Sequence, residues 1–290
     1  MKEIIVLSSK NYENSDTVNY GDCILINTGT ELIIYDCGHE RHAEEVIKYM
    51  EENHFSKAKL ILSHNDTDHF NGIPKLLDED KISVIRTTLL LKYKDEILEA
   101  IDDGRKTRES VARQLLDLYD NIAKLSGYPI EDIYKNEEDL CPEVSIAGPD
   151  FTYMIDTVAK RLDGREGDTQ DGETAVNATS IQVKIKWGKN TILLCGDCSF
   201  ASIEDKIRDY EIVQLPHHGK SKQANAIFEK KADQFNNIYI VSDNTGNSNG
   251  GSDKLDTTGH RVYNTKDGNI KIDETMLNRF SAKTGKILGI

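Results

Sequence analysis

A cluster of metal-binding residue types follows an apolar segment in the first quarter of the chain. Two histidines and two aspartates fall within the six residues from His64 to His69, directly after the apolar segment 59–63. Imidazole and carboxylate groups are ordinary ligands of zinc, manganese and iron. In a tight loop between a strand and a helix, His64 and Asp66 can turn toward one point, and Asp68 and His69 toward a second. The spacing therefore predicts two neighbouring metal sites that share one water molecule, an arrangement used for hydrolysis.

Further ligands must come from later in the chain, because one short cluster cannot complete two sites. The apolar segment 191–195 leads to Asp197, and the segment 211–215 leads to His217 and His218. Taken singly, an aspartate after a strand is commonly a helix cap, and a pair of surface histidines commonly has no role. Occurring together and in this order, the three segments predict strand ends that converge on one metal-binding edge.

The segments around these residues have the patterns of short strands and amphipathic helices. Apolar stretches bounded by Gly, Asn, Asp or Ser predict β-strands at 3–7, 23–27, 31–36, 59–63, 82–86, 180–187, 191–195, 211–215 and 237–241. The turn at 27–30 predicts a hairpin between two of these strands. Helical spacing of apolar residues predicts helices at 43–53 and 73–77.

Between residues 92 and 136 the pattern changes to one typical of charged helices. Apolar residues that recur every three or four positions mark one buried helical face, at Val111, Leu115, Leu118, Ile122 and Leu125. The sequence DDG at 102–104 predicts a break between two helices. We interpret the block as a helical insertion in a single domain that spans residues 1–290. Its basic group is either a solvated face or a flank that holds substrate, and comprises Arg105, Lys106, Arg108 and Arg113.

Composition limits the classes of function that need to be considered. The chain has 290 residues, 38% of them hydrophobic, and a formal net charge of −14. A non-specific nucleic-acid coat is usually basic, so the charge argues against that role, although a nuclease could use bound cations to hold phosphate. No apolar stretch approaches the roughly 18 residues of a membrane span, and the polar start predicts no signal peptide. We expect a cytoplasmic protein that does not bind membranes.

The cysteines predict reduced thiols and not a disulfide framework. The set is sparse and odd in number, and comprises Cys23, Cys37, Cys141, Cys195 and Cys198. The last two form a C-x-x-C, which is a weak zinc or redox signal. The interpretation of Asp197 as a metal ligand is the better account of this segment.

The motifs resemble the metallo-β-lactamase superfamily of binuclear metallohydrolases, and within it the hydrolase domain of ComEC-type competence proteins. The segment SHNDTDHFNG is similar to the pattern S-H-x-D-x-D-H-x-G-G, with Asn71 in place of the first glycine. LLCGDC resembles the L-x-G-D strand end, and LPHHGKS resembles the P-H-H-G-S segment. Supporting likenesses are GDCILI, LIIYDCG, NATS at 177–180, and VYNTKDGNI at 262–270, which resembles a closing hairpin. The resemblance implies an α/β fold of the αββα sandwich type, with the metals at one edge.

The ligands that the resemblance implies are His64 and Asp66 for a first ion, Asp68, His69 and His217 for a second, and Asp197 as a bridge. Asp36 would lie behind them and orient a ligand histidine. Many members of the family hold the first ion with a further histidine, but this sequence has none between His69 and His217. Asn177 stands near that position, which implies a weaker or more open first site. Residues 242–246 only loosely resemble the substrate loop of the family.

The chemistry of such a site follows from two divalent ions, zinc or manganese. A water shared by two ions loses a proton near neutral pH, so the metal-bridging hydroxide is the expected nucleophile, held in line by Asp68 or Asp197. His218 is the candidate general acid or phosphate donor. The competing interpretation makes His218 the ligand and His217 its helper, and the strand-end position favours His217 as the ligand. A first site rich in carboxylates makes manganese as plausible as zinc.

The resemblance favours hydrolysis of phosphodiesters, most simply cleavage of DNA or RNA by a metal-dependent nuclease. Lys220 and Lys222 either neutralise a phosphate of the substrate or are ordinary loop lysines. The alternative is a small-molecule phosphodiesterase or other ester hydrolase, similar to a phosphorylcholine esterase or acting on cyclic nucleotides, and the acidic composition favours this class. A non-enzymatic regulatory module is a third class, which the intact ligand set opposes. The sequence does not identify a protein partner.

Overall fold

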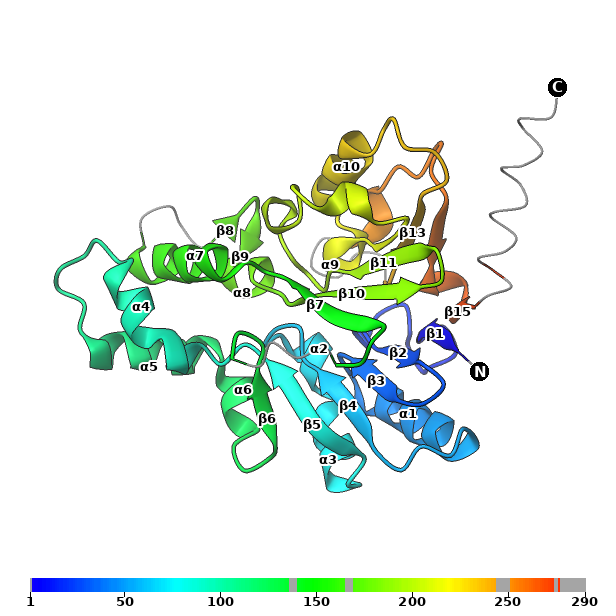
Figure 1. Cartoon of the computed structure of the whole chain (residues 1–290), viewed down its shortest axis with the longest axis horizontal. Coiled ribbons are helices and arrows are strands. Elements are labelled where there is room, and N and C mark those ends of the chain that lie inside the picture. The colour runs from blue at the N-terminus through cyan, green and yellow to red at the C-terminus, as the bar shows by residue number, and fades with distance from the viewer. Residues whose placement is uncertain (1, 136–139, 165–168, 244–250, 274–275, 277–290) are drawn as a thin grey trace.

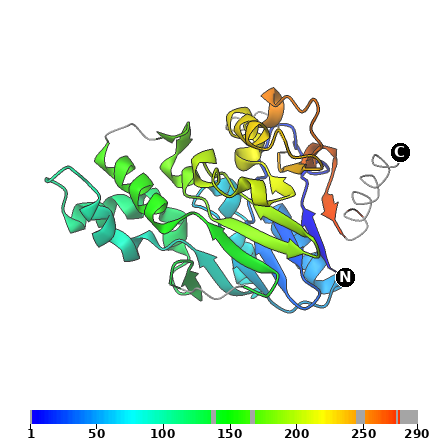
Figure 2. The same cartoon turned by 45° about the horizontal axis from the view of Figure 1, so that its top comes forward.

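The computed structural model describes the chain except residues 1, 136–139, 165–168, 244–250, 274–275 and 277–290. Two β-sheets face each other, and helices cover the outer face of each (Figure 1). Figure 2 shows the green and yellow strands of the second sheet lying across the blue strands of the first. The predicted αββα architecture is therefore confirmed.

The first sheet combines an antiparallel half with a parallel half. In the described residues its strand order is β15 (Ile270–Ile272), β1 (Glu3–Val6), β2 (Ile24–Asn27), β3 (Leu32–Tyr35), β4 (Ala58–Ile61), β5 (Ile82–Thr87) and β6 (Ile130–Asp132). The short turn between β2 and β3 makes them antiparallel, as predicted. Helices α1 (Glu40–Glu52) and α3 (Ile73–Asp78) connect the strands from β3 to β5, which are parallel because such connections return the chain to the same end of the sheet.

The second sheet has the same mixed character. Its described strands lie in the order β14 (Val262–Asn264), β13 (Ile238–Val241), β12 (Ile212–Gln214), β11 (Asn190–Leu194), β10 (Gln182–Trp187) and β7 (Val144–Gly148). Strands β10 and β11 form an antiparallel hairpin, and the strands from β11 to β14 are parallel. The carboxyl ends of β11 and β12 therefore meet at one edge.

The alternation of side chains along each strand builds three apolar layers. In β2, Ile24 and Ile26 pack between the sheets, whereas Leu25 packs against the helices outside. On the other sheet, Leu194 faces the inner layer, and Leu193 packs toward α10 (Ser221–Lys230). Because successive side chains of a strand point to opposite faces, strands buried on both faces are apolar throughout. This explains why these strands appear in the sequence as continuous apolar segments.

In its described residues, the predicted insertion contains three α-helices and one strand. Helices α4 (Lys94–Glu99), α5 (Arg108–Leu118) and α6 (Asp120–Lys124) lie within it, with the predicted break between α4 and α5. The chain then adds β6 to the first sheet, so the block is not wholly helical. Figure 1 shows α4 and α5 beside α7 (Phe151–Asp163) at one end of the sandwich. The insertion thus extends the helical layer of the first sheet.

Two of the four residues of the basic group, Arg105 and Arg108, form ion pairs at the surface. Arg105 pairs with Asp103 at 2.8 Å, and Arg108 pairs with Asp95 at 2.6 Å. The side chains of Arg105, Arg108 and Asp95 are at least half exposed, whereas that of Asp103 is more buried. This arrangement favours the solvated face over the substrate-holding flank.

The segment at 262–270 is not a closing hairpin. Strand β14 pairs with β13 in the second sheet, and β15 pairs with β1 in the first. A 3₁₀ turn at Thr265–Asp267, followed by Gly268 with φ of 131°, carries the chain from one sheet to the other. The alternation of apolar residues is the same in either arrangement, so the motif alone did not distinguish them. Within the described part of the chain, no helix combines the length and apolarity needed to cross a membrane.

Candidate metal centre

Three chain segments with metal-binding side chains meet where strands of the two sheets end. The first follows β4 and enters α2 (Thr67–Phe70), the second follows β11, and the third follows β12 and forms α9 (Pro216–Gly219). Each of β4, β11 and β12 lies in the parallel part of its sheet. Loops at the carboxyl ends of parallel strands are the usual place for functional groups. The sandwich therefore brings together residues that are distant in the sequence, such as Asp68 and His218, which are 150 positions apart.

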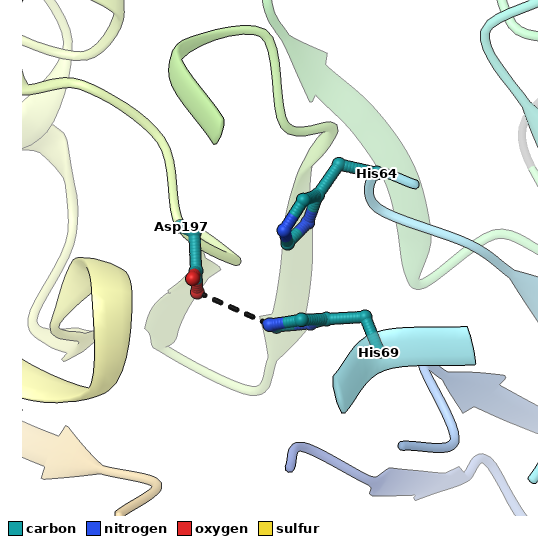
Figure 3. Close-up of side chains that lie close together, drawn as sticks. All are labelled: His64, His69 and Asp197. Carbon is teal, nitrogen blue, oxygen red and sulfur yellow. Dashed lines mark ion pairs between the residues drawn. The ribbon is translucent and has the colours of Figure 1, made fainter. Parts of the chain in front are cut away.

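The side chains of His64, His69 and Asp197 point toward one another (Figure 3). The two imidazole centroids are 4.1 Å apart, and Nε2 of His69 lies 3.3 Å from Oδ1 of Asp197. Among the described residues, Nε2 of each histidine and this Oδ1 are buried without a hydrogen-bond partner. Buried polar atoms without partners are costly, and a cation at this point would satisfy all three. The donor set therefore fits a metal ion.

A second donor group lies on the other side of Asp197. It comprises Asp68, His69 and His218, whose donor atoms lie within 4.8 Å of one another. Nε2 of His218 is 3.2 Å from Oδ2 of Asp68 and 3.7 Å from Oδ2 of Asp197. Asp197 thus offers one oxygen to each group. The buried clusters are consistent with a binuclear metal site.

The electrostatics of the cluster favour positive charge at its centre. Burial alone would raise the pKa of the Asp197 carboxyl, but His218 and His69 hold it well below its usual range. Burial would likewise lower the pKa of His69, yet the carboxylates of Asp197 and Asp36 raise it well above its ordinary value. The pKa of His218 rises for the same reason, through Asp197 and Asp22. Divalent cations would have to displace the protons that these carboxylates hold on the imidazoles.

Asp36 lies behind the cluster and contacts His69 and Ser63. Its Oδ2 accepts hydrogen bonds from Oγ of Ser63 at 2.6 Å and from Nδ1 of His69 at 2.8 Å. Oγ of Ser63 in turn lies 2.8 Å from Nδ1 of His64. Fixing Nδ1 of an imidazole in this way leaves Nε2 free to bind a metal. One carboxylate therefore orients His69 directly and His64 through Ser63.

The two consecutive histidines of α9 point in different directions. His217 and His218 have φ values of 51° and 55°, a left-handed conformation that is uncommon for residues other than glycine. Their ring planes are 72° apart. Nδ1 of His218 lies 2.9 Å from the carbonyl of Ser242, so its Nε2 faces Asp68 and Asp197. Nδ1 of His217 lies 2.5 Å from the carboxylate of Glu173.

Of the two histidines, His218 lies in the compact donor groups of the described chain, whereas the expected ligand His217 does not. Nε2 of His217 lies 3.8 Å from Oδ2 of Asp197, and only His218 joins the compact donor groups of the described residues. Asp66, the other expected ligand, has a side chain that is 40% exposed, and its Oδ2 is 3.7 Å from Nε2 of His64. Asp66 therefore lies at the open rim, where its carboxylate would have to turn inward to bind an ion.

The expected substrate residues have other partners in the structure. Asn177 is buried in α8 (Ala175–Ala178), where its Oδ1 accepts a hydrogen bond from Thr174. Lys220 donates to Glu173 at 2.8 Å and to the carbonyl of Gly172 at 3.0 Å. The exposed Lys222 lies beside Gly172. The arrangement does not bring Asn177 into the compact donor groups, and Lys220 is already neutralised by a buried carboxylate.

Sequence reasoning missed three residues of the centre. Asp22 lies 3.2 Å from Nδ1 of His218, and Nδ2 of Asn19 donates to Oδ2 of Asp68 at 2.7 Å. Glu173 is 1% exposed, although the acidic segment around it is typical of a surface loop. The GD pair at 21–22 was a signal for Asp22. No local signal marks Glu173, because its partners His217, Lys220 and Gln223 lie more than forty residues away.

The loop that carries Asp68 is packed closely against two glycines, Gly21 and Gly38. A Cβ on Gly38 would lie 2.0 Å from the carbonyl oxygen of Asp68, whereas one on Gly104 would meet nothing within 4 Å. We expect Gly38→Ala to cost about 3 kcal/mol of the free energy of unfolding, at the upper end for overpacking. Denaturant unfolding and metal content measure the effect. Gly104→Ala is the matched control, and equal stability of the two variants would contradict the prediction.

Comparisons with known proteins agree with this description. The sequence profile of the Metallo-beta-lactamase superfamily matches residues 16–241. The structure is similar to that of Tm1679, described as a metal-dependent hydrolase of the beta-lactamase superfamily, with 13% identity, a TM-score of 0.54, and coverage of 94% of this chain and 99% of that one. It is also similar to the metallo-beta-lactamase fold protein YhfI from Bacillus subtilis, with 13% identity, a TM-score of 0.52, and coverage of 93% and 100%. A search of curated protein sequences found no significant match. Because the profile covers well over half of its length, the chain belongs to the metallo-beta-lactamase superfamily.

Proposed function

We propose that the protein is a hydrolase that depends on two divalent metal ions and acts on phosphodiesters. The observation that carries the proposal is a set of three overlapping buried donor groups in the described residues, two of which contain Asp197. Three of their donor atoms, Nε2 of His64, Nε2 of His69 and Oδ1 of Asp197, lack a hydrogen-bond partner there. Imidazole and carboxylate donors fit zinc and manganese alike. The description of Tm1679 as a metal-dependent hydrolase supports the reaction class. The finer likeness to ComEC-type hydrolase domains stays a prediction.

We assign most of the ligands from the geometry of the donor groups, and Asp66, which lies outside them, from the motif. His64 and Asp66 would hold one ion, with Oδ1 of Asp197 facing them. Asp68, His69 and His218 would hold the other, with Oδ2 of Asp197 completing it. This assignment keeps the early cluster of the sequence analysis and replaces His217 with His218. Its support is the distance of 3.2 Å between Nε2 of His218 and Oδ2 of Asp68.

His217 would then supply the proton that the leaving group needs. When bound, the two ions would supply an activated water and stabilise the negative charge that develops on phosphate. Glu173 holds Nδ1 of His217 at 2.5 Å, which leaves Nε2 directed at the centre, 3.8 Å from Asp197. A proton at this Nε2 is placed for transfer to a leaving oxygen. Lys220 pairs with the same carboxylate of Glu173 at 2.8 Å, so this carboxylate fixes both side chains.

The substrate is most simply DNA or RNA, and the charge distribution supports a second candidate. The motif likeness supports a nuclease. However, the arginines Arg105 and Arg108 of the insertion are paired with acidic residues, and the net charge is −14. Long polynucleotides are usually held by a basic surface, so a small phosphodiester is the second candidate.

One assay distinguishes these candidates. The purified protein with Mn²⁺ or Zn²⁺ is tested on single- and double-stranded DNA, on RNA and on bis(p-nitrophenyl) phosphate, with an Asp68→Ala, His69→Ala double variant as control. Cleavage of polymers supports the nuclease, and cleavage of the dye ester alone supports a small substrate. Absence of metal-dependent turnover on every phosphodiester would contradict the proposed function and leave other esters, such as lactones or thioesters.

A further inference from the structure

One residue of the metal-binding loop is bonded to the helical insertion and not to the loop itself. Asn65 stands between His64 and Asp66 and is 6% exposed. Its Nδ2 donates to the carbonyl of Leu118 at 3.1 Å and to Oδ1 of Asp120 at 3.2 Å. Its Oδ1 accepts from the backbone N–H of Ile122 at 3.0 Å. The amide group of Asn65 therefore has its hydrogen-bonding groups occupied by the insertion.

A second asparagine closes the connection from the insertion. Asn121 is also 6% exposed, and its Nδ2 donates to the backbone carbonyl of Asn65 at 2.7 Å. Its Oδ1 accepts from Nζ of Lys124 at 2.7 Å, which fixes the orientation of the amide. Together, four hydrogen bonds join Asn65 to the segment 118–122.

The ends of two helices explain why this segment accepts such a partner. Tyr119, with φ of −126° and ψ of 42°, interrupts the helix between α5 and α6. The last carbonyls of α5 and the first N–H groups of α6 lack partners within their helices, and Tyr119 supplies no side-chain cap. Asn65 bonds to one group of each kind, at Leu118 and at Ile122. It therefore caps both helices from a distant part of the chain.

We propose that the junction of α5 and α6 is a positioning element of the metal centre, and that Asn65 and Asn121 are its positioning residues. The Asp36 and Ser63 side chains hold the loop at the start, on the side of His64. Asp66 begins α2 without a side-chain hydrogen bond to that helix. The direction of the Asp66 side chain therefore depends on the backbone of the preceding residue, Asn65, which the junction holds in place. The junction acts mainly on the ion assigned to His64 and Asp66.

The test uses Asn121→Ala in the full chain, because Asn121 lies outside the metal-binding motif. The metal-binding arm, which rests on the proposed function, measures the affinity for Mn²⁺ and for Zn²⁺ by calorimetry. We expect one ion to bind about 10–100-fold more weakly, as is usual when a residue behind a ligand is lost, and the other to stay within about threefold. Gln114→Ala is the matched control, since Gln114 lies in the same insertion and bonds to Lys106.

A second arm needs no metal. Hydrogen exchange of the metal-free protein should show faster exchange of the amides at 64–67 in Asn121→Ala and unchanged exchange in Gln114→Ala. Unchanged affinities together with unchanged exchange would overturn the inference. So would equally weakened binding of both ions together with a large loss of thermal stability, because the role would then be merely structural.

If the wild type binds no ion, the proposed function fails, whereas the exchange arm still decides the inference. If Asn121→Ala does not fold, Asn65→Asp replaces it, because it loses both donated hydrogen bonds and keeps the acceptor.

Discussion

Asp197→Asn should abolish the binding of at least one metal ion and lower the rate of hydrolysis by about a thousandfold or more. Asp197 is the only residue of the centre whose two oxygens face different donor groups in the described structure. The substitution keeps the shape of the side chain but replaces a charged oxygen with an amide nitrogen. Because that nitrogen can only donate, it opposes a cation at the position where Asp197 offers an acceptor.

The change is measured by metal content and by thermal unfolding with and without metal. For the wild type, metal at about a hundred times its Kd should add about 2.7 kcal/mol of stability, which corresponds to about 5 °C in the unfolding temperature of a chain of this size. We expect the variant to lose most of this shift. The metal-free variant should still fold, because the amide fits the space of the carboxylate.

Asp205→Asn is the matched control, since Asp205 is exposed in the segment that follows the centre. It should keep both ions and the full stabilisation by metal. If Asp197→Asn retained two ions and the full shift in unfolding temperature, Asp197 would not be shared between them. The centre would then have to be reassigned around Asp22, which lies beside His218.

The parts of the site that the sequence predicted are those in which donors stand directly at strand ends. The cluster from His64 to His69 follows β4, and Asp197 follows β11, so the local pattern gives both the element and the functional group. The sheet topology then brings these ends together. Strands such as β2 and β3 are apolar along their whole length and buried on both faces, which agrees with a sandwich covered by helices. The αββα order itself was predicted from the resemblance of the motifs, because strand patterns such as the alternating one of β10 occur in many folds.

The parts that were not predicted depend on backbone conformation and on contacts between distant segments. A short helix would place His217 and His218 on neighbouring faces, whereas their left-handed values of φ accompany different partners, Glu173 for His217 and the Ser242 carbonyl for His218. Glu173 gains its role from His217, 44 residues later in the chain. Asn65 gains its role from the insertion, more than fifty residues away. Such pairings leave no periodicity in a single sequence, because either partner alone resembles an ordinary loop residue.

His217→Ala and His218→Ala should have different effects, and the difference tests the assignment of the two histidines. His218→Ala should remove about one ion per chain, since Nε2 of His218 lies 3.2 Å from Asp68 within a compact donor group. His217→Ala should keep both ions. It should lower kcat by about 10²- to 10⁴-fold on an alkyl phosphodiester or dinucleotide, which is the usual effect of losing a general acid.

The leaving group makes the test sharper. Bis(p-nitrophenyl) phosphate releases a phenolate that needs little protonation, so His217→Ala should slow its hydrolysis much less than that of the alkyl ester. Glu173→Gln should follow the pattern of His217→Ala, because Glu173 holds Nδ1 of His217 at 2.5 Å. His54→Asn is the control, since His54 is exposed and asparagine tolerates its φ of 61°. If His217→Ala lost an ion and His218→Ala kept both, His217 would be the ligand and His218 the proton donor, because the structural reason for reversing them would have failed.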